Sequence, residues 1–282
     1  MSVSNDITQT GQLSEKPAAA EQDPVYVIKI GGNIIDDETQ LHAFLTAFAA
    51  VKGKKILVHG GGKLATRLAE QMGVQQQLVD GRRITDAETL KIVTMVYAGY
   101  INKHIVAGLQ SKGCNAIGLS GADGDLIRAH KRVHPVLDYG FVGDIDSVNT
   151  KLIGQLLEAQ DALVVAPITH DGSGLLLNTN ADTIAQEIAT GLGKHFTTIL
   201  IYSFEKPGVL LDVNDEASLI PSIHPAYYTE LKAKSLIFAG MIPKLDNAFA
   251  ALEKGVRKVI IGNAASLQQL MEGKTGTIIH HE

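Results

Sequence analysis

From Pro24 onward, short apolar runs alternate with stretches that carry apolar residues at helical spacing. Residues 25–30 and 55–59 are rich in β-branched and aliphatic side chains and are predicted to be buried strands. Residues 39–50 and 64–72 have the spacing of helices. The alternation continues with predicted strands at 116–119, 163–166, 198–202 and 258–261, and predicted helices at 88–109, 149–159, 181–191, 225–235 and 243–254. This order predicts an α/β fold, a three-layer αβα sandwich around a mostly parallel sheet.

The pattern also divides the chain into a polar beginning and two groups of alternating units. Residues 1–23 are rich in Ser, Thr, Gln, Ala and Glu, show no apolar period and are predicted to form a flexible tail. Residues 24–193 and 194–282 are predicted to form two lobes. Within the first lobe, residues 126–145 alternate between turns that contain Pro and Gly, which is typical of a hairpin region.

Composition narrows the class of protein. Hydrophobic residues make up 45% and charged residues 20% of the 282, as in ordinary soluble domains. The formal net charge of -5 argues against a nucleic-acid partner, and no apolar run approaches the ~18 residues of a membrane span. A single cysteine, Cys114, fits a reducing cytoplasm, and residues 1–23 resemble no secretory or transit signal. We therefore expect a cytoplasmic protein that binds neither nucleic acid nor membrane.

One lysine interrupts the first apolar run just before its turn. Lys29 lies inside the predicted strand, where an unpaired ammonium group is costly, so it requires a carboxylate, a bound anion or a route to solvent. Gly31 and Gly32 follow, and without a Cβ they leave backbone N–H groups open to an anion. This stretch alone is equally compatible with a lysine that reaches solvent from an edge strand and with a phosphate-facing lysine.

Glycine turns also follow three other predicted strands. They are Gly60-Gly61-Gly62, Ser120-Gly121 and the turn around Gly208. Open α/β sheets bind ligands at the carboxyl ends of their strands. Two such turns that face one crevice are therefore suited to a phosphoryl group, and the start of the helix after Gly62 favours an anion as well.

Two nucleotide-binding alternatives compete for these glycines. Residues 60–65 match G-x-G-x-x-A, with Asp80 at about the distance expected in a dinucleotide site. That interpretation requires Asp80 to end a second long strand, and residues 75–79 form a poor one. A dehydrogenase is therefore disfavoured. A P-loop NTPase is disfavoured as well, because no G-x-x-x-x-G-K-[ST] sequence occurs.

Two helix starts carry polar residues beyond what capping requires. In Asn178-Thr179-Asn180-Ala181-Asp182, Asn180 is a predicted N-cap and Asp182 falls in the first helical turn, where it is placed to pair with a lysine. Lys244 falls at the start of another helix, where the helix dipole disfavours a cation. A bound anion offsets that cost, although a purely structural role explains Lys244 equally well when it is taken alone.

Together these motifs resemble those of the amino acid kinase family, and within it the members that phosphorylate N-acetyl-L-glutamate. Eight segments follow the family's order between Tyr26 and Ile278. They are K-I-G-G at Lys29, H-G-G-G at His59, G-R-R-I-T-D at Gly81, N-K at Asn102, G-L-S-G-A-D-G at Gly118, F-V-G-D-I at Phe141, N-T-N-A-D at Asn178 and G-M-I-P-K at Gly240.

The resemblance implies roles for the matching residues. Lys29 and Lys244 would bind the ATP phosphates and stabilise the transferring phosphoryl group, while Asp182 would hold both ammonium groups. The lobe of residues 24–193 would bind the substrate, and Arg83 would bind its α-carboxylate. The substrate-binding residues would be Gly61, Gly62, Arg83, Asn178 and Asn180. The nucleotide and its phosphates would contact Gly31, Gly32, Glu205, Gly208, Val209, Leu210 and Gly240, and residues 194–282 would form the nucleotide lobe.

The implied reaction is the ATP-dependent phosphorylation of the γ-carboxylate of N-acetyl-L-glutamate, a step of arginine biosynthesis. A carboxylate is already nucleophilic, so positioning and charge neutralisation suffice. Mg²⁺ would bridge the phosphates, and no protein metal ligand is assigned. The alternatives are a kinase of another acylated glutamate such as N-succinylglutamate, a kinase of another carboxylate amino acid such as aspartate, and a non-catalytic amino-acid sensor. Retention of both lysines and Asp182 argues against the sensor.

The chain departs from the family pattern in two places. Residues 203–209 are one residue longer than the family's usual segment and lack its Asp, so Glu205 is expected to take that place. Arginine-sensitive members carry an additional N-terminal helix that joins dimers into hexamers. Residues 1–23 lack an apolar face for this role, and we predict a homodimer that arginine does not inhibit.

Overall fold

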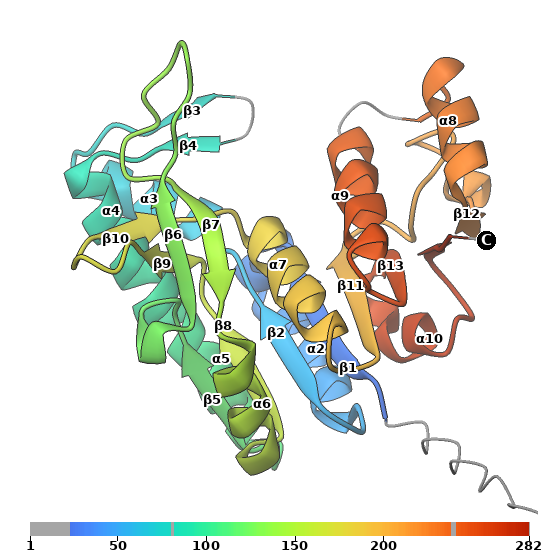
Figure 1. Ribbon diagram of the computed structural model, residues 1–282, viewed down its shortest axis with the longest axis horizontal. Coiled ribbons are helices and arrows are strands. Elements are labelled where there is room, and N and C mark those ends of the chain that lie inside the picture. Colours follow the sequence, from blue (N-terminus) through green and yellow to red (C-terminus); the bar gives the residue numbers. More distant parts are fainter. Residues whose placement is uncertain (1–22, 80–81, 238–240, 282) are drawn as a thin grey trace, which may run out of the picture.

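An eight-stranded sheet runs through the middle of the protein, seen here in a computed structural model that describes residues 23–79, 82–237 and 241–281 (Figure 1). Its strand order is β12-β14-β13-β11-β1-β2-β8-β5. The six strands from β13 to β5 are parallel, and β14 runs antiparallel to β13. The strands are β1 (Val25–Ile30), β2 (Lys55–Val58), β5 (Ala116–Leu119), β8 (Ala162–Val165), β11 (Thr198–Phe204), β12 (Ser222–Ile223), β13 (Lys258–Asn263) and β14 (Thr277–Ile279).

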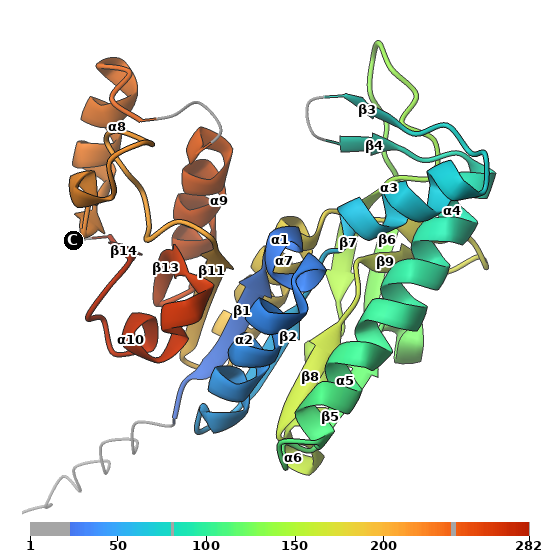
Figure 2. The ribbon, with the colours of Figure 1, turned by 180° about the vertical axis from the view of Figure 1, so that it is seen from behind.

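Helices cover both faces of this sheet (Figures 1 and 2). One layer consists of α6 (Thr150–Ala159), α7 (Ala181–Gly193), α8 (Pro225–Ala233) and α9 (Ile242–Glu253). The other consists of α1 (Gly32–Asp36), α2 (Glu38–Ala50), α3 (Gly62–Gln71), α4 (Ala87–Thr94), α5 (Asn102–Gln110) and α10 (Leu267–Met271). Buried side chains form two clusters, and β1 contributes Val25 and Val27 to one and Ile28 and Ile30 to the other. The predicted three-layer αβα sandwich is confirmed.

Two smaller sheets lie at one end of the molecule. The hairpin of β3 (Gln77–Val79) and β4 (Arg82–Ile84) projects beside the loop that joins β6 to β7, as both views show (Figures 1 and 2). The four-stranded sheet has the order β10-β9-β6-β7, and its strands are β6 (Ile127–Lys131), β7 (Gly143–Val148), β9 (Ile168–His170) and β10 (Leu176–Asn178). The predicted hairpin region is confirmed by the antiparallel pairing of β6 with β7.

The fold corrects one sequence interpretation and agrees with the rejection of another. The single helix predicted at residues 88–109 is interrupted by a π-helical segment, Met95–Ile101, between α4 and α5. The segment that a dinucleotide site requires as a second long strand forms β3, a three-residue strand that pairs with β4 and is not part of the central sheet. The dehydrogenase alternative therefore lacks its second strand, and Asp80 lies outside the described residues.

The central sheet contains strands from both predicted lobes. β1, from residues 24–193, pairs along its whole length with β11, from residues 194–282. Of the predicted tail, residues 1–22 lie outside the described part of the chain, and Asp23 is exposed. Within the described ranges, none of the helices combines the length and the apolar character needed to span a bilayer.

Candidate active site

Three charged side chains meet where β1 ends and where α7 and α9 begin. One carboxylate oxygen of Asp182, Oδ1, lies 2.7 Å from the Nζ atom of Lys29, and the other, Oδ2, accepts a hydrogen bond of 3.0 Å from the Nζ atom of Lys244. β1 contributes Lys29, the first turn of α7 contributes Asp182, and the first turn of α9 contributes Lys244. The structure thus brings together the three residues that the sequence assigned to catalysis.

The two ammonium groups keep Asp182 ionised. Burial alone raises the pKa of this carboxyl group, but the charges of Lys29 and Lys244 outweigh burial and hold the pKa at about 2. The side chains of Lys29 and Asp182 are only 15% and 21% exposed, so water screens their attraction less than at the surface. At neutral pH the cluster carries two positive charges and one negative charge, and it attracts an anion.

The aromatic ring of Tyr202 forms part of the same cluster. Tyr202 lies opposite Lys29 in the β1–β11 pairing, and its hydroxyl group donates a hydrogen bond of 3.4 Å to the carbonyl oxygen of Asp182. The Nζ atom of Lys244 lies 5.8 Å from the centre of the ring, within cation–π distance. Burial raises the pKa of the Tyr202 hydroxyl group, so Tyr202 stays neutral and acts as a packing surface. Sequence reasoning missed this residue, because strand register is not visible in the sequence.

At the end of β1, the prediction of two open N–H groups requires a correction. The N–H group of Gly31 donates to the carbonyl oxygen of Ser203 at 3.1 Å, which extends the β1–β11 ladder by one bond. Gly31 also has an ordinary φ of -72°. Gly32, in contrast, is the first residue of α1, where N–H groups lack helical partners, and a Cβ there would meet open space. Only Gly32 has the expected geometry.

At the end of β2, Gly61 requires glycine for two reasons. Its φ is +142°, and a Cβ atom at this position would lie 2.1 Å from Cδ1 of Ile101. Gly61 is the N-cap of α3 and Gly62 is the first residue of that helix, so their N–H groups lie at the positive end of the helix dipole. This turn therefore matches the predicted anion cradle.

A buried histidine supports this turn. Nδ1 of His59 lies 2.9 Å from the carbonyl oxygen of Gly60, and Nε2 lies 3.3 Å from Nδ2 of Asn102. A carbonyl oxygen only accepts, so Nδ1 carries the proton and Nε2 accepts from the amide. Burial lowers the pKa of His59 to about 4, which keeps the ring neutral. In a trans peptide the Gly61 N–H points away from the Gly60 carbonyl, and His59 thereby orients that N–H.

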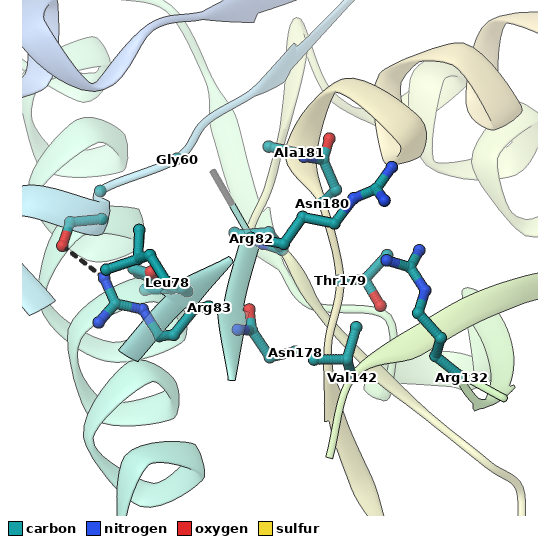
Figure 3. A pocket seen from close by; sticks show the side chains of 14 residues that line it. Gly60, Leu78, Arg82, Arg83, Arg132, Val142, Asn178, Thr179, Asn180 and Ala181 are labelled. Carbon is teal, nitrogen blue, oxygen red and sulfur yellow. Dashed lines mark hydrogen bonds between the residues drawn. The ribbon is translucent and has the colours of Figure 1, made fainter. Parts of the chain in front are cut away.

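Beside this turn lies a pocket that is lined by all five predicted substrate residues, among them Gly61, Gly62, Asn178 and Asn180 (Figure 3). Arg83, from β4, lines it as well. One terminal nitrogen of Arg83 donates to the carbonyl oxygen of Gly62 and the hydroxyl of Thr66, both at 2.9 Å, and the other donates to Gln76. These bonds occupy three of the five guanidinium N–H donors and leave two for a ligand.

The two asparagines are held by different partners. Nδ2 of Asn178 donates to the hydroxyl group of Thr85 at 3.0 Å. The side-chain oxygen of Asn180 accepts from the N–H groups of Asp182 and Thr183 at 2.8 and 3.1 Å, so Asn180 is the predicted N-cap and has only its amide NH₂ left for a ligand. Lys29, Asp182 and Lys244 do not line the pocket itself; they adjoin it through the first turn of α7.

Comparison with known proteins decides the family. The amino acid kinase family matches residues 24–263. The chain belongs to the amino acid kinase family. The resemblance inferred from the eight motifs is confirmed, and the chain is a kinase, an enzyme class that uses ATP.

Individual relatives agree with this assignment. An acetylglutamate kinase from Phocaeicola vulgatus is 53% identical over 253 residues, which cover 90% of this chain and 97% of that protein. One from Cytophaga hutchinsonii is 55% identical, covering 89% of this chain and 96% of its own length. Among solved structures, an N-acetylglutamate synthase from Neisseria gonorrhoeae, complexed with coenzyme A and N-acetyl-glutamate, shares the fold with a TM-score of 0.77 at 22% identity, over 92% of this chain and 60% of that one.

Apart from Gly31 and Gly32, the residues that the amino acid kinase resemblance assigns to the nucleotide follow β11 in the chain. Glu205 is exposed, and its carbonyl oxygen accepts a hydrogen bond of 2.8 Å from Asn263. A Cβ on Gly208 would lie 2.7 Å from Oγ1 of Thr277, which also accepts the N–H of Val209 at 2.8 Å. Val209 and Leu210 are buried, so their side chains serve packing. Gly240 lies outside the described residues. The nucleotide-binding roles stay predictions.

Two further arginines line the pocket and were missed from the sequence. Arg82 precedes Arg83 in β4, and Arg132 follows β6 (Figure 3). The doubled arginine of G-R-R-I-T-D was the available signal for Arg82. Nothing in the sequence indicated Arg132, since its place in the pocket depends on how the β6–β7 loop folds against the site.

Proposed function

We propose that this chain transfers the γ-phosphoryl group of ATP to the γ-carboxylate of N-acetyl-L-glutamate, as a step of arginine biosynthesis. The single observation that carries the proposal is the ion-paired cluster of Lys29, Asp182 and Lys244 at the start of α7, next to the glycine turn of Gly61 and Gly62. The names of the two kinase relatives given above support the choice of substrate.

The chemistry requires positioning and charge neutralisation only. A γ-carboxylate oxygen attacks the γ-phosphorus, the bond from phosphorus to the β–γ bridging oxygen breaks, and ADP leaves without any proton transfer. Lys29 and Lys244 stabilise the negative charge that spreads over the phosphoryl oxygens, and the N–H groups of Gly32, Gly61 and Gly62 hold the reacting oxygens. Asp182 positions both lysines and contacts no reacting atom.

On the substrate side, Arg83 binds the α-carboxylate with the two N–H donors that its structural bonds leave over. Asn178 lines the same pocket and binds the same end of the substrate, and Asn180 contributes its amide NH₂. Residues 24–193 therefore act as the substrate lobe, and residues 194–282, with Glu205, Gly208, Val209, Leu210 and Gly240, act as the nucleotide lobe.

Mg²⁺ is proposed as a cofactor that would be held through the ATP phosphates, with no side chain of the lysine cluster assigned as its ligand. The donor set fits this arrangement, because the Asp182 carboxylate is already engaged by two ammonium groups and the cluster presents cationic groups that match phosphate oxygens. When bound, the ion supplies additional neutralisation of phosphate charge.

We further propose that the enzyme is a homodimer that arginine does not inhibit.

A coupled assay of ADP formation tests the proposal. We expect turnover with N-acetyl-L-glutamate and little with glutamate or aspartate, and none at all if the protein is a sensor. Lys29→Ala and Lys244→Ala should each lower kcat by on the order of 10³-fold, since each removes a charge that acts on the transition state. Arg83→Ala should mainly raise the KM for the amino-acid substrate.

Lys234→Ala is the matched control, because Lys234 is also ion-paired, to Glu230, but lies on the surface beyond the site. Its kcat should equal that of the unmodified enzyme. A near-normal kcat in either Lys29→Ala or Lys244→Ala would refute the roles given to these lysines.

A further inference from the structure

The pocket beside Gly61 and Gly62 contains more positive charge than the proposed substrate uses. Among the residues that the structure describes, its lining includes three guanidinium groups, those of Arg82, Arg83 and Arg132, and no acidic side chain. This inference rests on the proposed function, in which Arg83 takes the α-carboxylate and the lysine cluster receives the γ-carboxylate. The acetyl group of N-acetyl-L-glutamate is uncharged, so it provides no partner for the other two arginines.

Arg82 is not placed to share the anion of Arg83. The two are consecutive residues of β4, and successive side chains of a strand point to opposite sides. In Figure 3 the side chain of Arg83 extends toward Gly60, whereas that of Arg82 extends toward Asn180. Arg82 is exposed, and among the described residues no carboxylate lies within ion-pair distance of it.

Arg132 faces the same side of the pocket as Arg82 and is firmly held. Its Nε atom donates to both carboxylate oxygens of Asp144 at 3.0 and 3.1 Å, and its guanidinium carbon lies 5.7 Å from the centre of the Tyr139 ring. The side chain is only 17% exposed. Asp144 occupies one edge of the guanidinium group, and the remaining N–H donors are left for a second acceptor; the group extends toward Thr179 (Figure 3).

Backbone pairing joins the segments that carry these arginines. Thr85, directly after β4, forms a β-bridge with Gly140 in the β6–β7 loop, and Val142 forms another with Asn178. The N–H groups of Thr85 and Phe141 extend this pairing with bonds of 2.9 and 2.6 Å. The segments that line the pocket are therefore held in place by backbone hydrogen bonds to one another.

We propose that this site also takes an N-acylglutamate whose acyl group ends in a carboxylate, as in N-succinyl-L-glutamate. The terminal carboxylate would lie between Arg82 and Arg132, while Arg83 keeps the α-carboxylate. Both arginines then act as specificity-determining residues for the acyl group. The phosphoryl transfer itself is unchanged, since the γ-carboxylate reacts in the same way.

The test compares kcat/KM for N-acetyl-, N-succinyl- and N-succinamoyl-L-glutamate. The last carries an uncharged amide in place of the terminal carboxylate of the succinyl group, so the ratio of the two measures the effect of that charge. A charge-assisted hydrogen bond predicts a preference for succinyl over succinamoyl of about 10- to 100-fold. Arg82→Gln should reduce that ratio at least tenfold. Arg67→Gln, which removes an exposed arginine on α3 outside the pocket lining, is the matched control and should leave the ratio as it is.

Arg132→Gln should reduce the same ratio, and its thermal midpoint shows whether loss of the Asp144 pair has disturbed the fold. Equal rates with the succinyl and succinamoyl compounds would overturn the inference. So would an Arg82→Gln enzyme with a raised KM for ATP and an unchanged ratio, since Arg82 would then serve the nucleotide. Turnover of N-acetyl-L-glutamate without turnover of the succinyl compound refutes this inference alone, whereas no turnover of any N-acylglutamate refutes the proposed function.

Discussion

Each carboxylate oxygen of Asp182 faces one ammonium group, so the three charges fix one another's positions before any ligand arrives. Without this carboxylate, Lys29 and Lys244 would repel each other and lose the geometry that phosphoryl transfer requires. An Asp carboxyl group has an ordinary pKa of 3.8, and in the folded protein the pKa of Asp182 is about 2. The stabilisation that ionised Asp182 provides is therefore complete at neutral pH and is lost only as the pH falls from 3.8 toward 2.

His59 gives a different pH dependence, which we predict to be measurable. In the unfolded chain its imidazole takes up a proton near its ordinary pKa of 6.5, whereas in the folded protein it does so only near 4. The unfolded state therefore binds more protons between these values, and the free energy of unfolding should fall as the pH drops from 6.5 to 4. The expected total loss is ~3 kcal/mol, and urea unfolding at a series of pH values would measure it.

His59→Asn is the control for this experiment. An asparagine amide places a donor where Nδ1 of His59 meets the Gly60 carbonyl, but it does not titrate in this range. The variant should have a flatter profile between pH 6.5 and 4 than the unmodified protein. Identical profiles would show that His59 does not titrate as described.

At the scale of elements, the turns after β1 and β2 look alike in sequence and differ in structure. Gly31 continues a strand ladder with an ordinary φ, while Gly61 has a φ that side-chain-bearing residues rarely adopt and is packed against Ile101. The turn after β2 thus requires glycine more strictly than the turn after β1. Its geometry places the Gly61 and Gly62 N–H groups at the start of α3.

Gly61→Ala should therefore destabilise the protein by about 2–4 kcal/mol, from backbone strain and overpacking together. Denaturant unfolding at neutral pH measures this loss. Gly60→Ala is the matched control in the same turn, because a Cβ there has no neighbour within 4 Å and its φ is ordinary. It should change the unfolding free energy by less than about 1 kcal/mol. Equal losses of unfolding free energy in Gly61→Ala and Gly60→Ala would show that Gly61 has no special requirement for glycine.

The elements that the sequence predicted best are those with a strong period and clear boundaries. Residues 25–30 and 181–191 fall on β1 and α7, and Asn149 caps α6 as expected. Short elements such as β3 and β12 carry too few residues for a period to show. The π-helical segment Met95–Ile101 was missed because its apolar residues fit an α-helix as well.

The candidate site was predictable where a residue's charge required a partner that the adjacent sequence does not supply. Lys29 in an apolar strand required a partner, and Asp182 is that partner. Tyr202 and Arg132 were not predictable, because their places depend on strand register and on the folding of a loop. Gly31 was assigned an open N–H wrongly, since only the pairing of β1 with β11 shows that Ser203 accepts it.

At the scale of the whole molecule, the predicted assembly is a homodimer. Residues 1–23 lack the apolar face with which an additional helix would join dimers into hexamers. Sedimentation should therefore give twice the 30.1 kDa mass of the chain, with and without arginine, and arginine should leave the rate unchanged. A hexamer, or inhibition by arginine, would contradict the prediction.

The place of β1 in the sheet has a consequence for the integrity of the fold. β2 and β11 are not paired with each other; each is paired with β1, which is the first strand of the chain. Loss of these six residues would cut the sheet into a four-stranded and a three-stranded piece, and the same cut would remove Lys29 from its carboxylate. The strand that joins the two parts of the central sheet thus also carries Lys29, one of the charges on which the proposed chemistry depends.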